Sequence, residues 1–488
     1  MDKDRNYYYM PYTALLSALS SLPLDGYTSD QREALGTLYE YIEESSPYAL
    51  FLLTGYAGTG KTFLLRTIAD LAQRAGLRVE LMASTGRAAK VLSASTGRPA
   101  STIHRTIYRA STQMQEEGGS FQLGRVSGAT PTLFIVDEAS MISGDTGEMT
   151  PFGSGNLLDD LLSYVWSADE AKLIFVGDTA QLPPVGTPLS DALNAEVLTS
   201  RYGLHVYGME LREVVRQKRG GILHNATLLR ELLDEYADED PEEILPIHLE
   251  TEGWRGIFPV EGGTFIETLD EAYRKYGEEE CLVICPSNKL ALECNHAIRS
   301  SVLFYEEEPV VRGERLIVAR NNYHYTKRPD RSDFIANGEI IEVQRIGRHY
   351  YEYGLHFADA TIYLPDRDDL LDVRLLLTSL EDPTPQRSQA ERQRLFELIA
   401  ADYADIPSIT DRRKAIRRDP FWGALEVKYG YAVTAHKAQG GQWACVFVDL
   451  SFVGYLPEDR NLVRWIYTAI TRATKRVYLL GYPAGLVD

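Results

Sequence analysis

The chain has 488 residues, of which 44% are hydrophobic and 25% charged, and its formal net charge is −20. This length predicts two to four domains, and the composition is that of a soluble globular protein. We find no signal-peptide pattern and no run of about 18 apolar residues, so we expect a cytoplasmic protein with no membrane partner. The net charge argues against nonspecific coating of nucleic acid but leaves room for a local basic groove. Four cysteines match neither a disulfide framework nor a C-x-x-C zinc site, and we expect buried thiols at Cys281, Cys285, Cys294 and Cys445.

The N-terminal region, residues 1–47, is helical by pattern. Thr28 or Ser29 would cap the helix that contains Gln31. The Gln31 amide can offer a donor and an acceptor to the edge of an adenine base. Its position shortly before a glycine-rich loop makes it a candidate for that contact. An ordinary glutamine on a helix surface explains this residue equally well.

The glycine-rich loop follows an apolar run of strand length, residues 48–54, and a helical apolar pattern follows it. Its pattern, G-x-x-x-x-G-K-[ST], is that of a phosphate-binding loop, in which backbone N–H groups and a helix N-terminus face the phosphates. Lys61 would reach the β- and γ-phosphates, and the Thr62 hydroxyl would hold Mg²⁺. A glycine-rich turn matched by chance is the alternative, and both flanks argue against it. The residues predicted to bind ATP are Gln31, Gly55, Ala57, Gly58, Thr59, Gly60, Lys61, Thr62 and Phe63.

Two later strands end in polar side chains. The first ends at Asp137 and Glu138, where we expect Asp137 to support Mg²⁺ and Glu138 to polarise the attacking water. A solvated acidic loop is the alternative for this pair. The next strand precedes Gln181, whose amide could sense the γ-phosphate or the water. Arg216 follows as a candidate charge stabiliser for the catalytic step.

The remaining pattern indicates two β/α halves, each with an insertion. A polar, glycine-rich stretch around Phe121 predicts a projecting β-hairpin. A second α/β unit begins near residue 264, and residues 344–426 combine a tyrosine-rich β-like stretch with charged helices. We interpret residues 344–426 as an inserted subdomain.

Taken in chain order, eight blocks resemble the motifs of superfamily 1 helicases of the RecD-like and Dda-like branch: GYAGTGKT, STGRAAKVL, STIHRTIY, VDEAS, GDTAQLPPV, LREVVRQ, VTAHKAQG and YTAITRA. The resemblance covers roughly residues 25–485. It implies an α/β fold with two RecA-like P-loop motor domains, an inserted β-hairpin and a β-barrel-like (SH3-like) subdomain. The expected boundaries are 1–108 with 131–260 for the first motor domain, 109–130 for the hairpin, 261–343 with 427–488 for the second motor domain, and 344–426 for the SH3-like and helical insertion.

The resemblance also implies roles for residues that their own chemistry leaves open. Arg216 and Arg472 match arginines that reach the γ-phosphate, so the expected catalytic set is Lys61, Glu138, Gln181, Arg216 and Arg472. Phe121 matches the position of a duplex-separating wedge only loosely, and a phenylalanine that packs beside a turn fits as well. Further residues match the family's strand-contacting blocks, which suit backbone phosphates: Thr85, Arg87, His104, Thr434, His436 and Lys437.

The resemblance therefore implies an ATP- and Mg²⁺-dependent DNA helicase that moves 5′→3′ on single-stranded DNA and acts at junctions of single and double strands. We expect a monomeric motor with replication or repair proteins as partners. An RNA helicase or a protein-displacing translocase stays open, as does a nucleotide-gated binding switch that does not unwind. A GTPase is disfavoured because the N-K-x-D guanine signature is missing: Asn288-Lys289 is followed by Leu-Ala.

Overall fold

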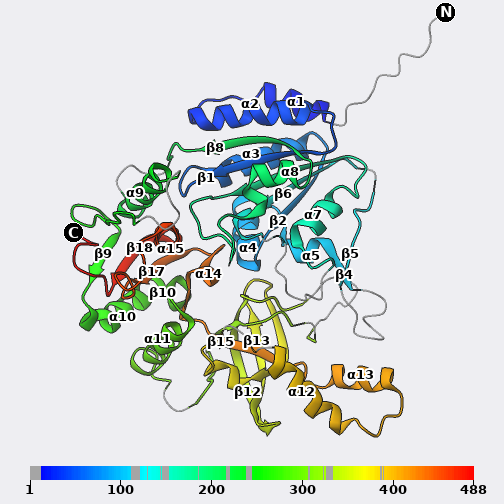
Figure 1. Cartoon of the computed structure of the whole chain (residues 1–488), viewed down its shortest axis with the longest axis vertical. Helices are drawn as coiled ribbons and strands as arrows, with labels where there is room; N and C mark the ends of the chain where they lie inside the picture. Colours follow the sequence, from blue (N-terminus) through cyan, green and yellow to red (C-terminus); the bar gives the residue numbers. More distant parts are fainter. Residues whose placement is uncertain are drawn as a thin grey trace, which may run out of the picture. The chain divides into compact units, whose positions relative to one another are not determined.

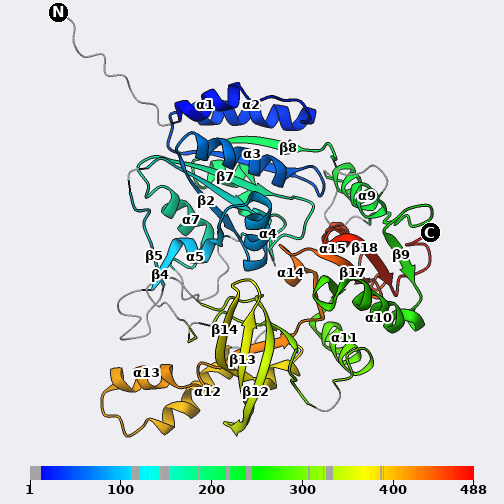
Figure 2. The same ribbon diagram turned by 180° about the vertical axis from the view of Figure 1, so that it is seen from behind.

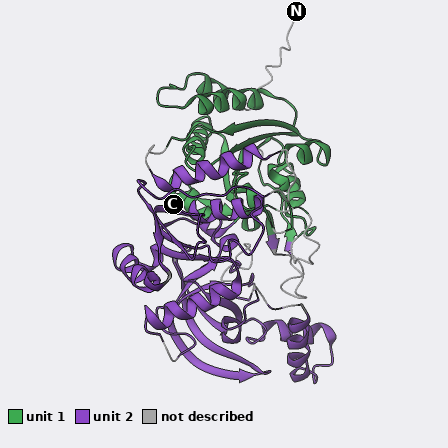
Figure 3. Ribbon diagram, turned by 60° about the vertical axis from the view of Figure 1, so that its left-hand side comes forward, with its two compact units in different colours: residues 1–84, 88–108, 122–216 green, residues 85–87, 109–121, 217–488 purple. Residues whose placement is uncertain are grey.

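The structure, a computed structural model, describes residues 12–110, 121–128, 130–142, 144, 153–184, 186–215, 220–237, 244–305, 308–322, 324–325, 334–384, 387 and 389–488. The chain forms two compact units, coloured separately in Figure 3. The first comprises residues 1–84, 88–108 and 122–216, and the second residues 85–87, 109–121 and 217–488. Each unit contains a parallel sheet with helices, which confirms the predicted α/β class (Figure 1). Among the described helices, none has the length and apolarity needed to cross a bilayer.

The first unit is built on a six-stranded parallel sheet of order β3-β2-β6-β7-β1-β8. Its central strands read as continuous apolar runs because helices bury both faces of a parallel sheet. All carboxyl ends meet at one edge of the sheet, which is where ligands bind in such folds. The strands are β1 (Ala49–Gly55), β2 (Arg78–Ala83), β3 (Ala100–Thr102), β6 (Thr132–Asp137), β7 (Ala171–Gly177) and β8 (His205–Leu211).

The helices of the first unit pack apolar stripes on this sheet. In α3 (Lys61–Arg74), residues at helical spacing such as Leu64, Leu65 and Ile68 are buried, and they belong to the same core as β1. The other helices are α1 (Thr13–Ser20), α2 (Ser29–Glu43), α4 (Gly86–Thr96), α5 (Ile103–Ile107), α7 (Leu157–Val165) and α8 (Ala195–Ser200), with 3₁₀ turns η1 (Ala139–Met141) and η2 (Asp191–Leu193).

A short hairpin is present where the sequence predicts one. Strands β4 (Tyr108–Ala110) and β5 (Phe121–Leu123) form a two-stranded sheet, and the residues between them lie outside the described part of the chain. Phe121 is only 4% exposed, and its ring centroid lies 6.1 Å from that of Phe334. The side chain therefore packs in this conformation as a core residue does, and its role as a wedge stays a prediction.

The second unit has a five-stranded parallel sheet of order β16-β10-β17-β18-β9. All four cysteines are free thiols. Three are buried in strands of this sheet (Cys281, Cys285 and Cys445), as expected, whereas Cys294 is only partly buried. The strands are β9 (Ile257–Val260), β10 (Cys281–Cys285), β16 (Ala432–Thr434), β17 (Trp443–Asp449) and β18 (Ala473–Leu480). The helices are α9 (Gly221–Glu235), α10 (Phe265–Tyr276), α11 (Asn288–Ser301), α14 (Ala435–Ala438) and α15 (Arg460–Ile470), with 3₁₀ turns η3 (Gly262–Thr264) and η4 (Glu278–Glu280).

A closed five-stranded barrel belongs to the second unit, as the predicted barrel-like insertion requires (Figure 2). The barrel draws on residues 315–429, a wider range than the predicted 344–426, because closure needs β11 and β15 as well as the long central hairpin. Its strands are β11 (Arg315–Val318), β12 (Ile340–Glu352), β13 (Leu355–Leu364), β14 (Asp369–Leu376) and β15 (Leu425–Tyr429). The turn η5 (Leu377–Leu380) and the helices α12 (Gln389–Asp402) and α13 (Ile409–Arg418) lie between β14 and β15.

A buried ion pair joins the barrel to its host sheet. Arg299 on α11 donates through Nε and Nη2 to the two carboxylate oxygens of Glu314, at 3.0 and 2.9 Å. The Tyr431 hydroxyl donates to the same carboxylate at 2.9 Å. The side chains of Arg299 and Glu314 are 6% and 0% exposed, so this bidentate pair is shielded from solvent.

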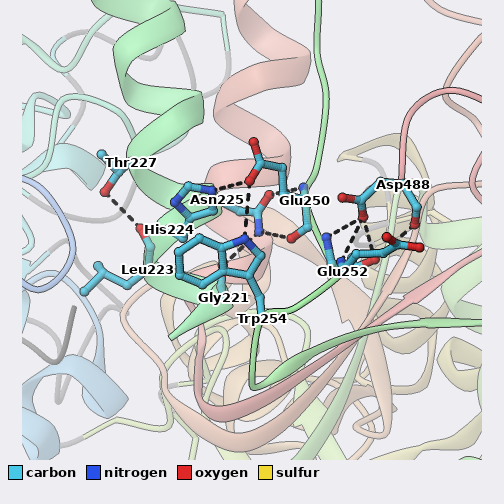
Figure 4. Close-up of polar contacts among 10 residues, drawn as sticks. Gly221, Leu223, His224, Asn225, Thr227, Glu250, Glu252, Trp254 and Asp488 are labelled. Carbon is cyan, nitrogen blue, oxygen red and sulfur yellow. Dashed lines mark hydrogen bonds and ion pairs between the residues drawn. The ribbon is translucent and has the colours of Figure 1, made fainter. Parts of the chain in front are cut away.

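A second polar cluster fixes the segment that precedes β9 (Figure 4). The Asn225 side chain exchanges two hydrogen bonds with the backbone of Glu250, and the His224 ring stacks on Trp254 with centroids 3.8 Å apart. The Asp488 carboxylate accepts from the Thr251 backbone and hydroxyl at 2.6 and 2.8 Å. These contacts hold α9 and the last residue of the chain against one loop.

Candidate active site

The carboxyl edge of the first sheet gathers three of the five predicted catalytic residues, Lys61, Glu138 and Gln181. Strands β6, β7, β1 and β8 are neighbours in this order, and their ends carry Asp137, the Gln181 loop, the phosphate loop and residues 212–215. Residues far apart in sequence therefore meet beside the N-terminus of α3.

The phosphate loop depends on glycine at specific positions. Gly58 and Gly60 have φ of 84° and 85°, a region that other residues adopt only under strain. A Cβ built on Gly60 would lie 2.5 Å from the Gln31 Nε2 atom, so a side chain there would also clash. The Thr59 hydroxyl is buried and donates to the Tyr56 carbonyl at 2.9 Å, which closes the loop on itself.

Lys61 is the first residue of α3, and its side chain folds back onto the loop. Its ammonium group donates to the carbonyls of Gly55 and Tyr56 at 2.5 and 2.9 Å. The charge is thus held beside the backbone N–H groups that would meet phosphate oxygens. The Thr62 side chain is exposed at the first turn of α3, where its hydroxyl can reach a ligand.

The two carboxylates lie at the end of β6. Asp137 Oδ1 accepts from the Glu138 backbone N–H at 2.9 Å, and Glu138 has a left-handed φ of 52°. Burial, and then the charge of Glu138, raise the pKa of Asp137 to about 7, while Lys61 opposes the shift. The Ser190 hydroxyl donates to the carbonyls of Ala139 and Ile142 and so fixes the turn after the pair.

These groups fit a magnesium ion. Mg²⁺ prefers carboxylate and hydroxyl oxygens and keeps several ligands from phosphates and water, so one carboxylate and Thr62 suffice. A buried carboxyl whose pKa is raised lacks compensating positive charge, which a divalent cation would supply. The described residues contain no group of three or more His, Cys, Asp or Glu side chains placed to hold a metal by themselves.

Gln181 follows β7 and is 6% exposed. Its backbone N–H donates to Asp178 at 3.3 Å, but its side-chain Oε1 atom is buried and has no hydrogen-bond partner among the described residues. An unsatisfied buried oxygen costs about 1–3 kcal/mol, so this atom is suited to a ligand or an ordered water.

Gln31 lies beside the phosphate loop, and both its amide oxygen and its amide nitrogen make a hydrogen bond within the protein. Its Oε1 accepts from the Thr28 N–H at 3.2 Å in a capping box, and its Nε2 donates to the Thr59 carbonyl at 3.0 Å. Gln31 would therefore exchange a protein partner for a base edge. Nearby, the exposed Phe63 ring lies 5.3 Å from the Tyr27 ring. Sequence reasoning missed Tyr27, although an aromatic residue four positions before Gln31 is a readable signal for stacking.

The start of α2 also holds the segment after β8, which the sequence did not predict. Asp30 accepts from the backbone N–H groups of Arg212 and Glu213, both at 2.7 Å. The Ser29 hydroxyl donates to Glu213 at 2.9 Å, and the Val215 N–H donates to the Gly58 carbonyl at 3.0 Å. Helix start, phosphate loop and residues 212–215 thus form one connected network. Arg216, the predicted charge stabiliser, lies outside the described residues.

In the second unit, Arg472 is buried and bonded to its own unit. It is 5% exposed, and its guanidinium donates to the carbonyls of Thr468 and Gly441 at 3.0 and 3.4 Å. Thr434, His436 and Lys437 lie together where β16 ends and α14 begins. Burial and the charge of Lys428 lower the pKa of Lys437 to about 8.

The other predicted strand-contacting residues are dispersed. His104 lies in α5, where burial lowers its pKa to about 4 and the carboxylate of Asp160 opposes the shift. Thr85 and Arg87 group with the second unit, where the Arg87 guanidinium lies 4.0 Å from the centre of the Trp443 ring. Burial lowers the pKa of Arg87 to about 10.

Comparison with known proteins gives two domain matches. Residues 26–243 match the AAA domain family, and residues 429–480 match the UvrD-like helicase C-terminal domain. The first match contains the phosphate loop and both carboxylates, and the second contains Thr434, Lys437 and Arg472.

Two characterised relatives align with these regions. The chain is 35% identical over 183 residues to the ATP-dependent RecD2 DNA helicase of Deinococcus radiodurans, which covers 38% of this chain and 23% of that protein. It is 25% identical over 492 residues to the ATP-dependent DNA helicase dda of Enterobacteria phage T4, covering 94% and 100% of the two chains. The chain therefore spans about a quarter of RecD2 and the full length of dda.

Among solved structures, the chain is similar to a Pif1 helicase from Bacteroides in complex with ADP-AlF3 and single-stranded DNA, with a TM-score of 0.44, 14% identity, and coverage of 95% and 94% of the two chains. The domain matches and the two helicase relatives, together with the ordered motifs, carry the assignment. They make this chain similar to the superfamily 1 helicases of the RecD-like and Dda-like branch.

Proposed function

We propose that this chain is an ATP-dependent DNA helicase that translocates 5′→3′ along single-stranded DNA and separates duplex DNA. The observation that supports it most directly is the single sheet edge that brings together the phosphate loop, Asp137, Glu138 and the unpaired Gln181 oxygen. Separate β/α units supply these groups, so their convergence is a property of the fold and not of one local motif.

We assign the hydrolytic roles as follows. The phosphate loop binds ATP through Gly55, Gly58, Gly60 and the Lys61 ammonium, which shifts from its two carbonyl partners to the phosphates. Glu138 takes a proton from the attacking water, and Gln181 orients that water or the γ-phosphate. Magnesium, held by Thr62 and Asp137, would neutralise charge on the β- and γ-phosphates. Arg216 and Arg472 stabilise the negative charge of the transferring phosphoryl group.

We assign the grip on DNA to six residues: Thr85, Arg87, His104, Thr434, His436 and Lys437. Their hydroxyl, imidazole and cationic groups suit backbone phosphates and confer no base preference. Direction comes from the ATP cycle, because contacts of this kind are the same at every step along the strand. We expect the motor to act as a monomer at junctions of single and double strands.

The decisive experiment is strand displacement on partial duplexes that carry either a 5′ or a 3′ single-stranded tail, with and without ATP and Mg²⁺. We expect displacement only from the 5′-tailed substrate and only with both ligands. Displacement from the 3′ tail alone would reverse the assigned polarity, and none from either would remove the helicase function.

Two further measurements separate the alternatives. Lys61→Ala should lower ATP turnover by about a hundredfold or more while single-strand binding stays measurable, because the phosphate contact is lost and the DNA contacts are not. RNA that stimulates the ATPase better than DNA would favour an RNA helicase. DNA-stimulated hydrolysis without displacement would favour a protein-displacing translocase, and nucleotide-dependent binding without turnover a gated switch.

A further inference from the structure

Helix α13 is a basic element in an acidic protein. Its ten residues, ITDRRKAIRR, carry five basic side chains and one acidic one, whereas the whole chain has a net charge of −20. Among its basic residues, Arg413 and Arg418 are exposed and Lys414 is partly exposed. None of these three has an ion-pair partner within the described part of the chain.

The helix is held in a defined orientation. Ile416 is buried with Leu395 and Ile399 of α12, and the Ser408 hydroxyl caps the first turn. Arg412 turns back and donates to the carbonyls of Ala404 and Ile406, at 3.1 and 2.8 Å. Arg412 is therefore a structural residue. Figures 1 and 2 show α12 and α13 projecting together from one side of the barrel.

The remaining charges are not explained by helix stability. Cations in the last turn complement the helix dipole, which accounts for Arg417 and Arg418. Lys414 and Arg418 are like charges at i,i+4 spacing, which destabilises a helix. A local arrangement that opposes stability and has no compensating contact is typical of a functional surface.

Further basic side chains line a groove on the barrel that reaches the segment directly after α13. A groove of about 430 Å³ is lined by Tyr325, Arg345, Arg348, Arg374 and Pro420, and Pro420 stands two residues after Arg418. Two carboxylates also line the groove. Asp359 binds Arg374 at 2.7 Å, whereas Asp372 lies 3.9 Å from Arg345 in a pair with both side chains highly exposed. Arg348 has no carboxylate partner among the described residues, and its guanidinium lies 5.1 Å from the centre of the Tyr350 ring.

We propose that Arg413, Lys414 and Arg418 of α13, together with Arg348 of the adjoining groove, bind the phosphate backbone of duplex DNA. Guanidinium groups match phosphate oxygens in bidentate geometry. The helical rise places Lys414 and Arg418 about 6 Å apart along the helix axis. This is close to two phosphate steps on one DNA strand, each about 3.4 Å along the duplex axis. Surfaces for single strands add aromatic side chains on which bases stack, and α13 has none. The proposal rests on the proposed function only in taking DNA as the polyanion.

The test is equilibrium binding of a blunt 30-base-pair duplex and a 30-nucleotide single strand over a series of salt concentrations. In the full chain, Arg413→Glu, Lys414→Glu and Arg418→Glu together should weaken duplex binding at least tenfold at low salt. The slope of log affinity against log salt should become shallower by about 2–3, since each duplex phosphate contact contributes roughly 0.9. ATPase stimulated by the single strand should stay within twofold of the wild-type value, which also reports correct folding.

A matched control reverses the charge of three exposed basic residues elsewhere: Arg66→Glu, Arg74→Glu and Lys275→Glu. This variant should keep the wild-type duplex affinity and the wild-type slope of log affinity against log salt. Arg413→Lys with Arg418→Lys keeps the charge and should retain most of the salt slope. An unchanged slope in the α13 variant, or an equal loss in the control, would overturn the proposal. So would loss of polyglutamate binding with duplex binding retained, which would assign the surface to an acidic protein.

The outcomes separate this inference from the proposed function. If the wild-type chain binds duplex through α13 but displaces no strand, the helicase function fails and the surface stands. If displacement occurs and the α13 variant binds duplex normally, the helicase function stands and the surface is rejected.

Discussion

Gln181 carries a buried amide oxygen that no described residue satisfies. We expect Gln181→Ala to lower the kcat of DNA-stimulated ATP hydrolysis by about a hundredfold, because the variant cannot orient the water or the γ-phosphate. The KM for ATP should change little, since the phosphate loop is intact. Steady-state kinetics at saturating single-stranded DNA measure both values, and Gln393→Ala, at an exposed glutamine of α12, is the control. A normal kcat in Gln181→Ala would contradict the role.

Asp137 makes the stability of the nucleotide-free protein depend on pH. Because its folded pKa is about 7 and its ordinary value 3.8, the folded state binds more protons than the unfolded state between these values. The free energy of unfolding therefore falls as pH rises between 3.8 and about 7, by about 1.4 kcal/mol per pH unit. Thermal unfolding from pH 5 to 8 should show a smaller fall for Asp137→Asn than for wild type. Mg²⁺ with a nucleotide should reduce the wild-type fall, and identical profiles for both proteins would refute the assignment.

Local pattern was sufficient to predict the glycine loop between a strand and a helix, because its glycines, lysine and flanking elements are consecutive in the chain. It also predicted that an apolar strand ends at Asp137, directly before Glu138. It could not identify Asp30, whose partners lie 182 and 183 residues further along the chain. Such a contact depends on strand order, which no single segment encodes.

At the scale of elements, Asp30 connects the start of α2 to the segment after β8. Asp30→Ala removes the acceptor of two backbone N–H groups, which should cost about 1–3 kcal/mol of unfolding free energy. Because Val215 in the same segment bonds to Gly58, we also expect the KM for ATP to rise severalfold. Asp30→Asn should recover part of both effects, and Asp25→Ala, at an exposed aspartate, should have neither. A change in stability without a change in KM would reject the link to the phosphate loop.

The pair of Arg299 and Glu314 joins α11 to the barrel. Glu314→Ala would leave a buried guanidinium without its carboxylate, and we expect a loss of about 3–5 kcal/mol in unfolding free energy. Glu293→Ala removes an exposed carboxylate that lies 4.0 Å from the Lys289 ammonium group. This variant should change the unfolding free energy by no more than about 0.5 kcal/mol. Denaturant titration of both variants measures the difference, and equal losses would show that burial of the pair does not matter.

The extent of the barrel illustrates the limit of sequence reading for elements. The long strands β12 and β13 are recognisable from their composition, and this is where the expected insertion begins. Strands β11 and β15 are only four and five residues long, so in sequence neither can be assigned to the barrel or to the host sheet. Their membership is decided by pairing: β11 pairs antiparallel with β12 and β15, and β15 also pairs parallel with β14, which is a long-range property.

For the whole molecule, Arg472 tests whether the second unit acts on hydrolysis in the first. We expect Arg472→Ala to lower DNA-stimulated kcat by about 10³-fold, the lower end of the range for arginines that neutralise a transferring phosphoryl group. Nucleotide affinity measured without turnover should change by less than a few fold. Arg472 is also bonded to carbonyls of its own unit, so its loss could lower stability. Arg472→Lys and a thermal unfolding profile of each variant therefore serve as controls for stability. A stable Arg472→Ala protein with normal turnover would exclude the role.

The order of motifs along the chain indicated the helicase resemblance before any coordinates, because eight blocks in sequence constrain function more strongly than any one of them. The basic cluster of residues 411–418 can also be read from the sequence, although the net charge is −20. The face on which its cations lie could not, because it depends on the burial of Ile416.

The burial of the native thiols has a practical consequence for observing this protein. A hydrogen bond with a neighbouring thiol, and then burial, raise the pKa values of Cys285 and Cys445, which keeps their thiolate fractions low at neutral pH. A maleimide dye should therefore react far faster with a cysteine introduced on the surface of each unit than with these two positions. Fluorescence energy transfer between two such dyes could follow the units through an ATP cycle without first removing the cysteines of β10 and β17.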